Sequence, residues 1–244
     1  MIRLRKLITV VILSVNGLFA QVTVELLVNN TESYRPKVVG NWTQQRGVLQ
    51  TAYHDYINQS LYLSTDLILA NIVPGSSISE IGIKVYQVPG GNNLARDQVI
   101  NFRIAYATTS STTLSTFAAT TVVYGPTDIS ITDFTADLWK MFTLDTPIVW
   151  NGTDNLIIEF SIDGVYWANG GGVYNREVSN RSLHGRSDSG HGSYPFTGIG
   201  VAALEFVPSL KITHNGPGVI VDPVVGVTTT EAGGTGTFNV QLNS

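Results

Sequence analysis

The sequence predicts an all-β protein, an antiparallel β-sandwich with a jelly-roll-like arrangement, on three observations. Val, Ile, Thr and Tyr are abundant, whereas charged residues make up only 13% of the chain. Short stretches of alternating apolar and polar residues follow one another, separated by Gly, Asn and Pro turn signals. No amphipathic helix of any length interrupts them. Branched and aromatic side chains suit a pleated sheet, and many strands in succession are typical of a sandwich.

The first 20 residues predict export. Arg3, Arg5 and Lys6 precede an apolar run over 7–13, and small residues end the segment at Ala20. This layout is typical of a signal peptide (1–20) cleaved after Ala20. A membrane anchor is the alternative, but polar residues interrupt the apolar stretch, which is shorter than the ~20 residues of a spanning helix. The mature chain is therefore expected to be secreted or at the cell surface, without membrane insertion.

Composition limits the partners and the source of stability. The chain has no cysteine, so an exported protein of this kind must rely on a packed core rather than on disulfides. Without the three basic residues of the signal segment, 11 basic residues remain against 18 acidic ones, a net charge near −7. This negative charge argues against nucleic acid and anionic lipid as partners.

The strand pattern begins at residue 21. A first strand is expected over 21–27, and the polar, turn-rich stretch that follows, to residue 59, is left unassigned. Alternating apolar residues predict later strands, and these cover 78–88, 98–107, 120–124, 138–144, 156–162, 172–175 and 201–213. Asn151-Gly152 and Asp163-Gly164 supply turns between them. A single short helix is expected around 67–70.

A break in composition divides the chain near its end. Asn, Gly, Pro and Gly occupy 215–218, which predicts a linker (215–220) after a sandwich domain over 21–214. The tail over 221–244 then begins a new strand pattern and stops without a partner strand. A lone strand cannot bury its apolar face, so we expect the start of a second, incomplete β repeat of a larger protein.

Two stretches resemble known modules. The segment 142–159, FTLDTPIVWNGTDNLIIE, is similar to the T-F-x-T-P-F-x-W-D-G-T-S-N-L-x-x-E signature of a β-sandwich module of large secreted proteins of Bacteroidota-type bacteria. Further landmarks extend this resemblance over about 60–213, although Asn151 stands where the signature has Asp. The segment 221–242, VDPVVGVTTTEAGGTGTFNVQL, resembles the opening of a Calx-β-type repeat. Both resemblances imply a multidomain extracellular protein, and neither implies a reaction.

Enzymatic interpretations find little support. Ser, His and Asp occur together over 184–191, but catalytic triads are assembled from separated segments, and a Gly/Ser-rich loop does not hold that geometry. We expect a solvated loop there, and the spacing of His184, Asp188 and His191 matches no established zinc motif. Glu159 lacks the second carboxylate that a glycosidase needs, so a surface or edge position is expected. We therefore predict no enzyme activity and no cofactor.

Calcium is the metal best suited to an exported β-sandwich, because hard cations bind oxygen atoms of Asp, Asn and loop carbonyls. Asp154 with Asn155 is one candidate, and Asp163 is another. By the Calx-β resemblance, Glu231 would ligate calcium with acids from later in the repeat. The alternative is that these residues form turns and a solvent-facing acid.

An extracellular glycan or a surface protein is the expected partner. Aromatic side chains offer flat apolar surfaces to sugar rings, and Asn, Asp and Arg offer hydrogen bonds. The candidate ligand-binding residues lie in a glycine-rich hairpin and a later loop, and they are Tyr166, Trp167, Tyr174, Arg176 and Tyr194. The alternative places Trp167 and Tyr174 in the core or at its rim.

The expected function is a noncatalytic adhesion or ligand-binding module. An accessory domain of a secreted hydrolase, with its catalytic domain elsewhere in a longer chain, is the alternative, and a structural spacer is a third. Trp139 and Trp150 fall in strand patterns and are expected to be structural.

Overall fold

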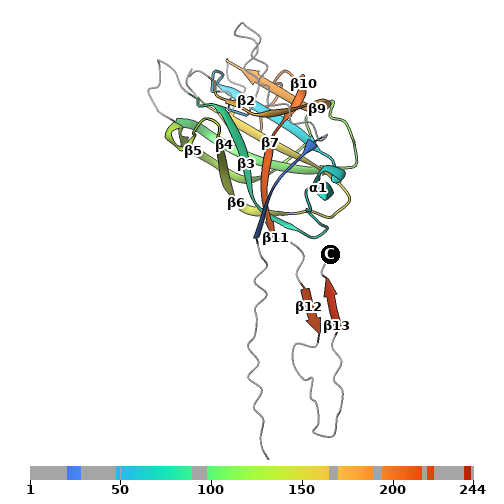
Figure 1. Cartoon of the computed structure of the whole chain (residues 1–244). Coiled ribbons are helices and arrows are strands. Elements are labelled where there is room, and N and C mark those ends of the chain that lie inside the picture. Colours follow the sequence, from blue (N-terminus) through green and yellow to red (C-terminus); the bar gives the residue numbers. More distant parts are fainter. Residues whose placement is uncertain are drawn as a thin grey trace, which may run out of the picture.

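Two antiparallel sheets form a β-sandwich, which confirms the predicted fold class (Figure 1). The structure is a computed structural model, and the residues it describes are 21–28, 48–49, 51–89, 98–164, 170–188, 194–215, 219–222 and 239–242. Within these residues no helix has the length and apolar character needed to cross a membrane.

The smaller sheet has five strands. Its order is β1 (Gln21–Glu25), β11 (Leu210–Asn215), β3 (Ser77–Gln87) and β6 (Trp139–Val149), and β8 (Gly172–Val173) also pairs with β3. The first residue of β1 pairs with the last residue of β11. The residues at which the chain enters and leaves the sandwich, Gln21 and Asn215, therefore lie side by side.

The larger sheet has six strands, in the order β10 (Ala202–Pro208), β9 (Asn175–Ser187), β2 (Asp55–Tyr62), β7 (Asn155–Asp163), β4 (Gln98–Thr109) and β5 (Thr121–Ser130). The predicted short helix is present as α1 (Ser64–Leu69), between β2 and β3, and a 3-10 turn (Ile131–Asp133) follows β5. In the tail, β12 (Val219–Asp222) and β13 (Asn239–Leu242) pair with each other in a separate sheet.

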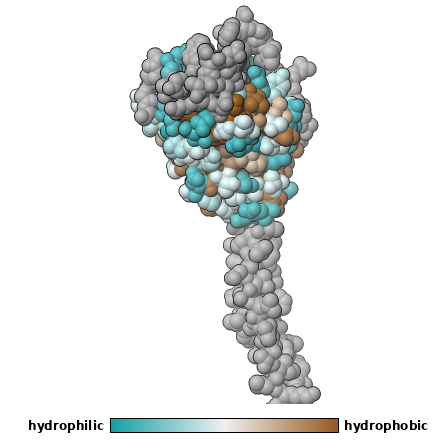
Figure 2. All heavy atoms as spheres, turned by 90° about the vertical axis from the view of Figure 1, so that its left-hand side faces the viewer, coloured by the Kyte–Doolittle hydropathy of each residue, from teal (hydrophilic) through white to brown (hydrophobic). Residues whose placement is uncertain are grey.

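The core lies between the two sheets. Along β7 the apolar residues Leu156, Ile158, Phe160 and Ile162 alternate inward, as predicted. The ring centres of Phe102 on β4 and Phe142 on β6 are 5.0 Å apart, and this stacked pair joins the two sheets. The ring of Phe160 lies 6.1 Å from that of Phe102. On the side of β5 and β6, the described surface mixes hydrophilic and hydrophobic residues (Figure 2).

Two central strands differ from the sequence prediction. Every residue of β2 is buried, although its first five residues, 55–59, lie in the unassigned stretch. The prediction of a solvated loop over 184–191 is wrong for residues 184–187, because they belong to β9. His184 is buried beside the ring of Tyr56. Asp188 follows the strand, and His191 lies outside the described residues.

The single strand expected over 201–213 is also wrong. Ser209 separates β10 from β11, and these two strands belong to different sheets. The backbone N–H of Ser209 donates to the carbonyl of Tyr174 (2.9 Å), which satisfies the donor where the chain changes sheets.

Candidate ligand-binding site

The outer face of the five-stranded sheet carries a group of aromatic and cationic side chains that we call the aromatic platform. Its members are Lys84, Tyr86, Trp139, Tyr174 and Lys211. Alternation places Lys84 and Tyr86 outside because their neighbours on β3, Ile83 and Val85, are buried in the core. All members are half-buried, so each is partly open to solvent.

Rings and ammonium groups alternate across the platform. The Lys211 Nζ atom lies 4.6 Å from the centre of the Trp139 ring. Lys84, the cross-strand partner of Trp139, places its Nζ 4.8 Å from the centre of the Tyr174 ring. The Tyr86 and Tyr174 rings meet edge to face, with centres 5.6 Å apart. Cations at this distance are attracted by the ring faces. These contacts fix how the side chains of the platform are arranged relative to one another.

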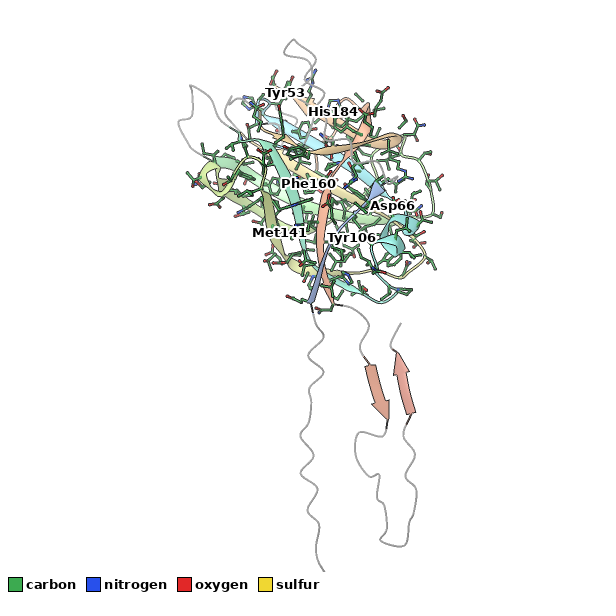
Figure 3. All side chains as sticks on the ribbon, viewed as in Figure 1. Tyr53, Asp66, Tyr106, Met141, Phe160 and His184 are labelled. Atoms are coloured by element: carbon green, nitrogen blue, oxygen red, sulfur yellow. The ribbon has the colours of Figure 1, made fainter. Side chains whose placement is uncertain are left out.

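Gly82 lies at the centre of this surface and is covered by the Met141 side chain. It pairs with Lys211 on one side and, on the other, with Met141 of β6, which is labelled in Figure 3. A Cβ atom at position 82 would lie 2.2 Å from the Met141 Sδ atom. The Met141 side chain therefore lies over β3 at this point, in the space that a side chain at position 82 would fill. Glycine inside a strand often marks such a close approach.

The two described residues of the predicted hairpin site, Tyr174 and Arg176, lie in different environments. Tyr174 belongs to the aromatic platform. Arg176 is only 2% exposed, and its guanidinium forms a 2.8 Å ion pair with Glu25 of β1. Burial and this pairing indicate a structural role for Arg176. Tyr166 and Trp167 lie outside the described residues.

Tyr194 lies on the outer face of the opposite sheet, in a hydrogen-bond network around Glu159 of β7. Its hydroxyl donates to Glu159 Oε1 (2.7 Å), while the Thr120 hydroxyl and the Gln59 Nε2 atom donate to Oε2 (2.9 and 2.7 Å). Glu159 is 1% exposed, so the expected surface or edge position is wrong. The carboxylate is buried because side chains from three other segments cover it and supply its hydrogen bonds.

This environment changes the ionisation of Tyr194. Burial raises the pKa of Tyr194 to about 12, and the nearby Glu159 carboxylate adds to the rise because it repels a phenolate. The Arg103 guanidinium lies over the Tyr194 ring, 4.8 Å from its centre, and opposes part of the shift. The network therefore holds a neutral phenol beside the carboxylate.

The predicted calcium ligands occupy the two ends of β7. Asp154 accepts a hydrogen bond from the Asn151 amide (2.8 Å), and the Asn155 side-chain carbonyl accepts one from the first backbone N–H of α1 (2.7 Å). Asp163 lies at the far end of the same strand. Among the residues that the structure describes, no group of three or more His, Asp or Glu side chains could hold a metal ion. Glu231 lies outside those residues.

Sequence reasoning missed most of the platform. Trp139 was assigned a structural role, which suits Trp150 better: Trp150 is fully buried and its Nε1 donates to the Asp154 carbonyl (2.8 Å). Alternation in the predicted strands could have placed Lys84 and Tyr86 on an outer face. It could not have shown that β11, β3 and β6 are neighbours.

Comparison with known proteins identifies no relative: no family model, no curated protein and no solved structure matches the chain. A β-sandwich hosts many unrelated functions, so function has to be argued from the chemistry of the site.

Proposed function

We propose that this chain is a noncatalytic ligand-binding module that attaches an extracellular protein to a glycan through the aromatic platform. The supporting observation is the presence of three partly exposed rings, Tyr86, Trp139 and Tyr174, on one sheet face beside cationic side chains. Aromatic faces provide the flat apolar surface on which sugar rings stack, and nearby polar groups set orientation.

The position of the platform along the strands supports this role. The last residue of β11, Asn215, pairs with Ser77 at the start of β3. Lys84 and Tyr86 lie seven to nine residues further along β3, which corresponds to roughly 25 Å of strand. Segments that join the sandwich at 21 and 215 would therefore leave the platform accessible to a ligand.

A glycan-array screen of the intact secreted chain, with calcium and again with chelator, tests the proposal. We expect binding that weakens about tenfold or more in Trp139→Ala and Tyr174→Ala, as for central aromatic contacts in other interfaces. Phe196→Ala is the matched control, because Phe196 packs against Tyr194 on the opposite sheet. Trp167→Ala tests the hairpin predicted from the sequence.

Each outcome has a distinct meaning. Binding lost only in Trp167→Ala would move the site to the hairpin and contradict a platform site. An array without binding would contradict the glycan proposal and favour a surface protein as partner. The hydrolase-accessory alternative uses the same platform to hold a substrate, and a catalytic domain in a longer version of the chain would favour it.

A further inference from the structure

We infer that the chain cross-links itself through an ester bond between the hydroxyl of Thr120 and the side-chain carbonyl carbon of Gln59. Such a bond requires a hydroxyl, a carboxamide and a carboxylate that can move a proton between them. The network around Glu159, on the outer face of the six-stranded sheet, brings these three groups together. The cross-link is independent of the aromatic platform, which lies on the opposite sheet.

One carboxylate oxygen contacts both reacting groups. Glu159 Oε2 accepts a hydrogen bond from the Thr120 hydroxyl (2.9 Å) and another from Gln59 Nε2 (2.7 Å). The oxygen that attacks and the nitrogen that leaves are therefore neighbours of the same atom. A general base must lie within hydrogen-bond reach of the proton it takes, and Glu159 meets this condition for both groups.

The backbone of Ala118 orients the amide. Its N–H donates to Gln59 Oε1 (2.8 Å), and its carbonyl accepts from Gln59 Nε2 (2.8 Å). When a hydroxyl attacks an amide carbon, negative charge develops on the carbonyl oxygen, and an N–H directed at that oxygen stabilises the charge. The Ala118 N–H is therefore positioned as the donor of an oxyanion hole.

The reaction consumes no co-reactant and releases one ammonia molecule. Glu159 takes the hydroxyl proton of Thr120, and Thr120 Oγ1 forms a bond to Gln59 Cδ. The tetrahedral carbon carries its negative charge on Oε1. Glu159 then gives the proton to the amide nitrogen, the C–N bond breaks, and ammonia leaves. The reaction occurs once in each chain and acts on no other molecule, so the module stays noncatalytic.

Burial favours the ester over its hydrolysis. Gln59 is fully buried, and Glu159 is 1% exposed. The Tyr194 hydroxyl donates to the other carboxylate oxygen, Glu159 Oε1, at 2.7 Å. Water would have to enter this site to cleave an ester, and a closed site keeps it out.

A small apolar cluster fixes the segment that supplies Thr120. In this segment, directly before β5, Phe117 and Ala118 pack against buried residues of the same outer face, which are Leu61, Leu114, Ile157 and Leu183. The ester would join β2 to the start of the edge strand β5 and close a loop of about 60 residues. Such a bond restricts the unfolded chain, as a disulfide does, in a protein that has no cysteine.

Mass spectrometry of the intact secreted chain tests the cross-link. Loss of ammonia should lower the mass by about 17 Da relative to the sequence. Trypsin cleaves after Lys and Arg, so Gln59 and Thr120 fall in separate peptides, 47–84 and 104–140. We expect these two peptides to remain joined, and dilute hydroxylamine, which cleaves esters and spares amides, to separate them.

Variants assign the roles of the two side chains that move the proton and attack. Thr120→Val and Glu159→Gln should abolish the joined peptides, whereas Thr120→Ser, which keeps a hydroxyl, should retain them. Thr143→Val is the matched control, because the Thr143 hydroxyl donates to Glu80 (3.0 Å) on the five-stranded sheet. This control should leave the yield of joined peptides unchanged.

The parent chain gives the decisive result, so a variant that fails to fold does not weaken the test. Separate peptides from the folded parent chain would overturn the cross-link. Joined peptides that persist in Thr120→Val would also overturn it. A mass loss of about 17 Da without joined peptides would place the loss of ammonia elsewhere, as in ring closure at Asn151-Gly152, and would contradict the ester.

Discussion

At the residue scale, the pKa of the Tyr194 hydroxyl depends on one neighbouring side chain, that of Glu159. Burial and the Glu159 carboxylate raise its pKa to about 12. In Glu159→Gln the charge is lost but the burial stays, so the pKa of Tyr194 should fall while remaining above 10. The measurement is tyrosinate absorbance during a pH titration, with Tyr194→Phe subtracted in each background. An unchanged pKa in Glu159→Gln would show that the carboxylate does not act on the phenol.

The same shift fixes a dependence of stability on pH. The folded pKa of Tyr194 lies above the ordinary tyrosine value of 10.0, so the folded state retains the phenolic proton more strongly than the unfolded state. Its contribution is complete below pH 10 and is lost as pH rises toward about 12. The urea midpoint should therefore fall less steeply over this range in Tyr194→Phe than in the parent chain. Equal slopes would argue against the burial of this phenol.

The burial of His214 predicts that stability depends on pH in the opposite direction. It is 2% exposed at the end of β11, and burial lowers its pKa from 6.5, although the Asn215 backbone opposes part of the shift. The unfolded state therefore binds the proton more readily. Stability is complete above pH 6.5 and is lost as pH falls toward the folded pKa. His214→Gln should lose less stability between pH 7 and pH 5 in urea unfolding, with His54→Gln as a control outside β11.

At the element scale, Gln59 connects a loop to the six-stranded sheet. Its side chain donates to the Ala118 carbonyl and accepts from the Ala118 N–H, both at 2.8 Å. Gln59→Leu removes both bonds and one donor to Glu159, at a cost of about 1–3 kcal/mol for the groups left unsatisfied. Hydrogen exchange around Ala118 should accelerate. Asn58→Leu, on the inner face of the same strand, should destabilise the chain without a selective effect on this loop.

Strand β2, which carries Asn58 and Gln59, shows why part of the fold was not predictable from sequence. The alternation in β7 is plain because one face is apolar, and it predicted the strand correctly. In β2, Asn58 and Gln59 are buried on opposite faces, and the acceptors of their side-chain amide N–H groups lie more than 50 residues away. Polar side chains interrupt the alternation of apolar and polar residues in β2. The groups that accept their hydrogen bonds become neighbours only when the chain folds.

The candidate site was predictable to a similar degree. Tyr174 and Tyr194 were predicted together as candidate ligand-binding residues, and the structure places them on opposite outer faces of the sandwich. The platform depends on the adjacency of β11, β3 and β6, which come from distant parts of the chain. Local composition has no information on this adjacency, and therefore Lys211 and Trp139 could not be paired from sequence.

At the scale of the whole molecule, the aromatic contact between the sheets should make them unfold together. Phe142 faces the core and stacks on Phe102 of the other sheet, whereas Trp139, on the same strand, faces outward. Phe142→Ala should lower the free energy of unfolding by about 3–5 kcal/mol. Trp139→Ala should lower it by less than Phe142→Ala does, since the Trp139 ring is only half-buried on the outer face.

Hydrogen exchange measured by mass spectrometry during urea unfolding checks this cooperativity. In Phe142→Ala, peptides from β3 and β7 should lose protection at the same lower urea concentration, because the cavity removes packing from both sheets at once. Loss of protection in β3 alone would mean that the five-stranded sheet unfolds independently. The aromatic platform would then lie on a separately stable layer, and ligand binding would raise the urea midpoint of that layer only.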